Sequence, residues 1–149
     1  MMSRILAVLL AGVLGGAVQA ASPEDFSGRW RSPDPVGLTV EQSAARGGFT
    51  LTMTAAEPET AINARFAQGD GPDRFVGTDN GAPLEGEPLI WARLEGEELV
   101  VYSMTVQQGG AIVLERFARR RDGEVMVFSL QARVGMDVTL AEGSLEPVR

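Results

Sequence analysis

The feature that constrains the fold most is a period-two alternation of apolar and polar residues, which recurs along most of the chain. In residues 49–55, Phe49, Leu51 and Met53 alternate with three threonines, and residues 126–133 repeat the pattern. Successive residues of a strand point to opposite faces, so each segment has one apolar and one mostly polar face. That arrangement is typical of antiparallel strands with one face on a core and the other in water. The pattern predicts an all-β protein.

Glycine-containing breaks separate the alternating segments, as at 46–48, 108–110 and 122–123. Glycine adopts positive φ at little cost, so these breaks predict tight hairpin turns. We therefore expect strands near residues 28–32, 36–43, 49–55, 62–67, 74–78, 88–94, 99–107, 111–119, 125–134 and 136–145. The segment 57–88 holds four prolines and five glycines, which predicts short, imperfect strands and long loops there.

Eight to ten short strands need protected edges, because an unpaired edge is a template for pairing with other chains. A meander that closes on itself removes its edges, so we predict a single antiparallel up-and-down barrel of eight to ten strands. A sandwich of two sheets produces the same alternation and remains the alternative.

Residues 1–20 have the pattern of a secretory signal peptide: Arg4, an apolar run from Ile5 to Val13, and small residues before Ala21. We expect cleavage after Ala20, which leaves one β-barrel domain at 21–149 in a periplasmic or secreted location. The apolar run is too short for a membrane span, so no membrane association is expected after the signal is removed.

Composition narrows the chemistry. The chain has no cysteine and no histidine, so the common nucleophile pairs and an ordinary zinc site are excluded. We expect a non-catalytic protein without a cofactor; a carboxylate-based enzyme is a weaker alternative, since no acid pair is positioned by the sequence. The net charge of −7 argues against nucleic-acid and anionic membrane partners.

A Gly-rich loop holds several oxygen-bearing side chains that a calcium ion would accept: Asp70, Asp73, Asp79 and Asn80. Their spacing matches no calcium loop, and Asp and Asn beside glycine are common in turns. We expect no metal site.

Gly28-Arg29-Trp30, at the entrance to the first expected strand, resembles the Gly-x-Trp opening of lipocalin-like (calycin) barrels. In that superfamily the tryptophan plugs the closed end of the barrel, and an arginine from a late strand packs over it. The resemblance implies a lipocalin-like barrel in which Arg133 or Arg149 supplies that arginine. The strand pattern of the resemblance extends over the whole mature chain, whereas its motif consists of three residues only: Gly28, Trp30 and the late arginine.

Residues 111–118 place a charge on each face, because Arg116 alternates with Glu115. A charge inside a barrel needs a partner, and an inward Arg116 would bind the carboxylate of a ligand. Tyr102 would join it at the polar head, while apolar residues line the cavity: Met104, Phe128 and Leu130. A cross-strand ion pair of Arg116, or a core role for Tyr102, is the structural alternative. This hypothesis predicts an exported barrel that binds a small apolar or amphiphilic ligand in its interior.

Trp91 lies on a strand without a clean polar face and is a candidate contact residue. It motivates the alternative function, a periplasmic protein-interaction module such as a hydrolase inhibitor, with a packed barrel. An interior cavity of about 300 Å³ or more would favour the ligand-binding hypothesis. A barrel filled by its own side chains would favour the protein-interaction hypothesis. The run 119–121, three consecutive arginines, is expected at a solvated hairpin tip.

Overall fold

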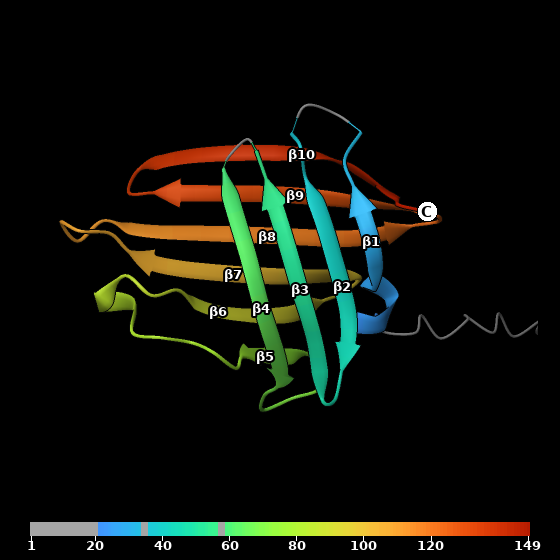
Figure 1. The fold of residues 1–149 in the computed structure, drawn as a ribbon, viewed down its shortest axis with the longest axis horizontal. Coiled ribbons are helices and arrows are strands. Elements are labelled where there is room, and N and C mark those ends of the chain that lie inside the picture. The colour runs from blue at the N-terminus through green and yellow to red at the C-terminus, as the bar shows by residue number, and fades with distance from the viewer. Residues whose placement is uncertain (1–20, 34–35, 57–58) are drawn as a thin grey trace, which may run out of the picture.

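The computed structural model describes residues 21–33, 36–56 and 59–149 (Figure 1). The predicted signal peptide, 1–20, lies outside them. Two short 3₁₀ helices, η1 (Pro23–Phe26) and η2 (Pro83–Glu85), accompany ten strands. The strands are β1 (Gly28–Arg31), β2 (Thr39–Ala45), β3 (Gly48–Ala55), β4 (Thr60–Gln68), β5 (Arg74–Gly77), β6 (Leu89–Glu95), β7 (Glu98–Val106), β8 (Ile112–Asp122), β9 (Val125–Val134) and β10 (Asp137–Pro147).

The ten strands form one closed barrel in which each strand pairs antiparallel with its neighbours in the chain, and β1 pairs with β10. The closing ladder is short, with Trp30 opposite Pro147 and Arg31 opposite Glu146. This confirms the all-β, antiparallel, up-and-down barrel and decides against the sandwich. In the described residues no helix is long and apolar enough to cross a membrane.

Two sequence expectations need correction. β4 is nine residues long and pairs with β3 along its length, so the Pro- and Gly-rich segment 57–88 is not uniformly irregular; β5, at four residues, is short as expected. β8 continues to Asp122. The arginines 119–121 therefore form the last part of β8, because the ladder to β9 runs to the Asp122–Val125 pair. Arg119 is buried and so is not at a solvated tip, whereas Arg120 and Arg121 are exposed beside the β8–β9 turn, as expected.

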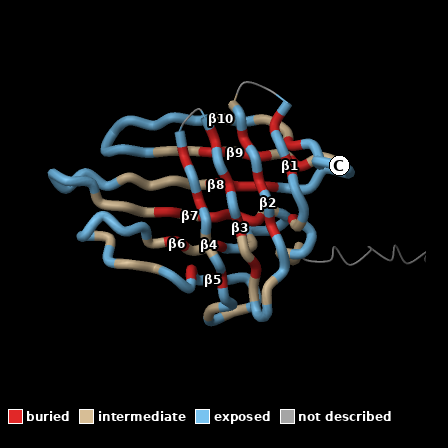
Figure 2. The backbone as a smooth tube through the Cα atoms, in the orientation of Figure 1, coloured by how far each residue is buried: buried red, intermediate tan, exposed pale blue. Residues whose placement is uncertain are grey.

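Buried residues recur along the strands in the middle of the barrel (Figure 2). They form one hydrophobic cluster, which includes Phe26 of η1. Phe49 stacks on Phe66 with ring centroids 4.6 Å apart, and the ring of Phe75 meets Phe49 edge-on at 5.3 Å. Phe26 of η1 is 1% exposed and covers one end of the barrel. We call that end, next to η1, the closed end.

At the opposite end, the strands β7–β10 project beyond β2–β4 (Figure 1). Burial follows this offset, since β8 is buried only at Phe117, Ala118 and Arg119, and β10 only at Leu145. The projecting part therefore has both of its faces at least partly open to solvent.

Candidate functional site

Four of the predicted site residues come together on the outer face of the barrel: Trp91, Tyr102, Met104 and Arg116. Tyr102 lies between Trp91 and Arg116 in the strand register. Their chain neighbours Ala92, Val101 and Phe117 are in the core, at most 1% exposed. Because strand residues alternate between faces, the four point outward.

The other two predicted residues, Phe128 and Leu130, lie in the core. The six are therefore not brought into one interior site. The physical reason is the parity of β8: once Phe117 enters the core, Arg116 must face out, and the sequence alone does not fix which of the two enters.

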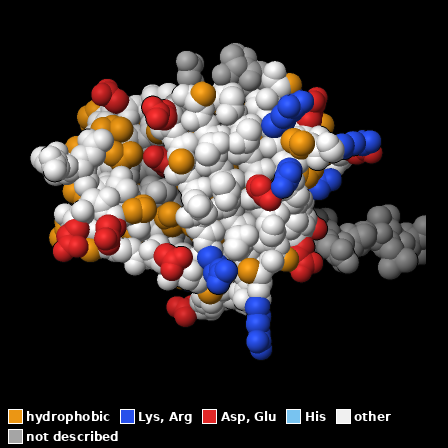
Figure 3. All heavy atoms as spheres, in the orientation of Figure 1, with side chains coloured by type: hydrophobic (Ala, Val, Ile, Leu, Met, Phe, Trp, Pro, Cys, Tyr) orange, Lys and Arg blue, Asp and Glu red, His pale blue; other side chains and the backbone are white. Residues whose placement is uncertain are grey.

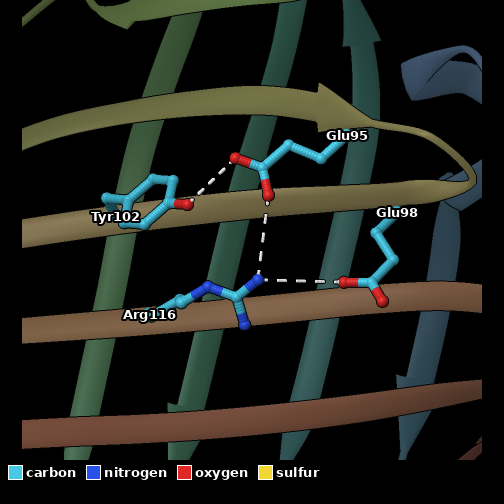
Figure 4. Close-up of polar contacts among 4 residues, drawn as sticks. All are labelled: Glu95, Glu98, Tyr102 and Arg116. Carbon is cyan, nitrogen blue, oxygen red and sulfur yellow. Dashed lines mark hydrogen bonds and ion pairs between the residues drawn. The ribbon is translucent and has the colours of Figure 1, made fainter.

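The outer cluster is built on a stacked aromatic pair. The rings of Trp91 and Tyr102 are 5.2 Å apart and inclined by 10°. Tyr102 Oη donates a hydrogen bond of 3.1 Å to Glu95 Oε1, and Arg116 Nη2 lies 3.8 Å from Glu95 Oε2 and 4.0 Å from Glu98 Oε2 (Figure 4). These long, partly exposed ion pairs hold Arg116 weakly.

A hollow of about 130 Å³ adjoins the aromatic pair and is lined by Tyr102, Leu114, Arg116, Gln131 and Arg133. The cluster thus offers a flat ring surface beside two guanidinium groups. Side chains of this kind are common at protein-binding surfaces.

Exposed large hydrophobic residues gather at the projecting end. Met136, at the tip of the β9–β10 hairpin, is 97% exposed, and Leu84 in η2 is 88% exposed. Figure 3 shows hydrophobic side chains collected at this end with acidic side chains among them. We call the following six residues the apolar end: Leu84, Ile112, Val134, Met136, Val138 and Leu140.

Two charged side chains on the inner face of β8, Glu115 and Arg119, are withdrawn from solvent, and neither was among the predicted site residues. Glu115 is half-buried, and burial raises the pKa of its carboxyl. Arg119 is completely buried, and burial lowers the pKa of its guanidinium to about 9. The sequence contains a signal for this placement, because Glu115, Phe117 and Arg119 are spaced by two residues and therefore share one face of the strand. Once Phe117 is assigned to the core, the two charged residues follow it.

Arg121, also on the inner face of β8, lies over the Trp30 ring at the closed end, 5.0 Å from its centroid. The resemblance implied Arg133 or Arg149 for this place. Arg133 instead lines the outer hollow, and Arg149 follows the end of β10. The arginine over Trp30 therefore comes from the basic run 119–121.

One residue of the Gly-rich loop considered for calcium, Asn80, has a structural role. Asn80 Nδ2 donates to the carbonyl of Ile90, and the Ile90 amide donates to Asn80 Oδ1, which ties the loop to β6. Within the part of the chain that the structure describes, no group of three or more acidic side chains is arranged to hold a metal ion.

Comparison of the chain with protein-family models, with curated proteins and with solved structures finds no match.

Proposed function

We propose that this protein is an exported, non-catalytic barrel that binds another protein through its apolar end and the adjoining outer cluster. The observation that carries the proposal is the gathering of six exposed large hydrophobic residues at one end of the molecule. Exposed apolar patches mark interaction sites in soluble proteins. The stacked Trp91–Tyr102 pair extends it with a rigid aromatic surface.

The filled interior supports a surface role over an enclosed ligand. The core cluster includes Phe26, Phe49, Phe66, Phe117 and Phe128, each at most 2% exposed. Aromatic side chains of this size occupy the space that a ligand of a few hundred daltons would need.

Charge favours a protein partner over a lipid surface. The chain carries 20 acidic against 13 basic residues, and Asp137 and Glu142 flank the apolar residues of β10. Anionic lipid headgroups would be repelled by these acids. The partner we propose therefore has an apolar centre and a basic rim.

We also propose a lipocalin-like relationship for the barrel. The support is the Gly28-x-Trp30 opening, the buried Trp30 and the cation of Arg121 packed on its ring. Gly28 and Trp30 match the resemblance, and Arg121 takes the place for which it implied Arg133 or Arg149. The proposal of partner binding does not depend on this relationship.

Photocrosslinking tests the proposed function. A benzophenone side chain at Met136 or Leu140, in the protein expressed in its own cell envelope, should give one discrete adduct with another protein. The matched control is Thr52, exposed on the opposite side in β3, which should give none. The adduct should be lost in Ile112→Glu with unchanged circular dichroism, and should weaken as salt rises.

Other outcomes would overturn the proposal. An adduct of twice the monomer mass would assign the apolar end to self-association, and a lipid adduct would assign it to a membrane. Equal labelling from Met136 and Thr52 would indicate non-specific contact. Native mass spectrometry adds the alternative: a bound species of a few hundred daltons, released by organic solvent, would replace the surface role with an interior ligand.

A further inference from the structure

Arg119 is the only charged side chain that the described residues bury completely. It lies near the closed end on the inner face of β8, opposite Leu99 and Phe128 in the register. The guanidinium carbon is 5.5 Å from the ring centroid of Phe26 and 5.1 Å from that of Phe117. Aromatic rings therefore cover it from η1 and from its own strand.

The hydrogen bonds of Arg119 are incomplete. Nη2 donates a 2.6 Å bond to Gln42 Oε1, and Gln42 Nε2 in turn donates to the Pro23 carbonyl. Nε and Nη1 are buried and have no acceptor among the described residues. A guanidinium carries five N–H donors, and each donor left unpaired in the interior costs free energy comparable to a lost hydrogen bond.

The charge of Arg119 is also uncompensated. None of the ion pairs of residues 21–33, 36–56 and 59–149 includes it. Burial lowers the pKa of the guanidinium to about 9, so the group is still a cation at neutral pH. The faces of Phe26 and Phe117 attract the cation, but Nε and Nη1 still have no hydrogen-bond acceptor.

We propose that Arg119 binds a small monovalent anion, a halide ion or a single carboxylate group, at its free Nε–H and Nη1–H groups beneath η1. One negative charge balances one guanidinium, and a small acceptor satisfies the two unpaired nitrogens. The size limit follows from the full burial of Phe26, Phe117 and Gln42 around it. η1 has only four residues and supplies both Phe26 and the Pro23 carbonyl. It is the shortest segment whose movement would let an anion reach Arg119.

This site is independent of the proposed function, because it lies at the closed end and the apolar end lies across the barrel (Figure 1). The proposal of protein binding at the apolar end can be wrong while the proposal of an anion site is right, and the anion site can be wrong while protein binding is right. The two are tested with different variants.

The first experiment measures the melting temperature of the mature protein in sulfate buffer at constant ionic strength while chloride, bromide or formate replaces sulfate. Saturable binding should raise Tm by about 5–10 °C at a hundredfold excess over Kd. Arg119→Met, which keeps the length and removes the charge, should show no such rise. The control Arg120→Met, on the outer face of the same strand, should behave as the wild type.

A second measurement does not depend on the fold of a variant. Crystals of the wild type grown in bromide should show an anomalous peak within hydrogen-bond distance of Arg119 Nε or Nη1.

The proposal is overturned by equal Tm responses in the wild type and Arg119→Met. It is also overturned if crystals grown in bromide show no anomalous peak at Arg119. A water molecule in the same place, with no anion dependence, would assign Arg119 to hydration alone.

Discussion

The guanidinium of Arg121 in β8 lies over the indole ring of Trp30 in β1, 5.0 Å from its centroid. Nη1 of the same arginine donates a 3.0 Å hydrogen bond to the carbonyl of Asp25 in η1, and Nη2 donates 2.8 Å to the carbonyl of Gly123. Trp30 itself donates through Nε1 to the Ser27 carbonyl at 3.2 Å. Arg121 thus fastens η1 over the closed end.

Arg121→Met should lower the free energy of unfolding by about 1–2 kcal/mol, because it removes a cation–π contact and two charge-assisted hydrogen bonds at a partly exposed site. Urea unfolding followed by circular dichroism measures this. Arg120→Met, one residue earlier on the opposite face, should change stability by less than about 0.5 kcal/mol. Equal costs for the two variants would contradict the fastening role.

Glu115→Gln should remove a pH dependence of stability. Burial raises the pKa of Glu115 above the ordinary value of a glutamate side chain, and its register neighbours Ser103 and Ala132 carry no charge. The folded state therefore holds this proton more tightly than the unfolded state. The contribution of Glu115 to stability is complete below the ordinary glutamate pKa and is lost as pH rises through the raised pKa.

The measurement is the urea midpoint of wild type and Glu115→Gln from pH 4 to pH 8. The variant should be more stable than the wild type at pH 7, and the difference should vanish at the acid end. Glu97→Gln, in the exposed β6–β7 turn, is the control and should leave the profile unchanged. The assignment would be refuted if Glu115→Gln were less stable than the wild type at pH 7.

Gly48→Ala should be strongly destabilising. A Cβ at Gly48 would lie 1.8 Å from the Phe66 carbonyl oxygen, and this backbone cannot move without shifting the stacked Phe49–Phe66 pair. We expect a cost of about 2–4 kcal/mol. At Gly69 the nearest atom would be 3.5 Å away, so Gly69→Ala should cost less than about 1 kcal/mol. Thermal melts of both variants compare the two costs.

Arg116→Ala and Phe117→Ala should separate the two faces of β8. Arg116 makes only partly exposed ion pairs of 3.8 and 4.0 Å, so its loss should cost no more than about 1 kcal/mol. Phe117 is 0% exposed, and its truncation should cost about 3–5 kcal/mol. Similar costs in chemical denaturation would mean that the register of β8 is different.

The strands could be predicted well from the sequence and the site less well, for one reason. Alternation and glycine turns are local, so β3, β7 and β9 were predicted within a few residues of their observed bounds. The same alternation separates Arg116 from Phe117 but does not say which side is the interior. The buried Arg119 was missed because a run of three arginines indicates solvent when it is considered without its partners.

What the sequence alone determined was the all-β class, the antiparallel order and the division of each strand into two faces, since these depend on residues close together in the chain. Only the tertiary structure decided which faces point inward, how far β7–β10 project and which arginine meets Trp30. Those features depend on the closure of β1 against β10 and on the stagger between strands, where residues more than a hundred positions apart are brought together. The free energy of packing the aromatic core selects that arrangement, and Arg119 is buried as a consequence.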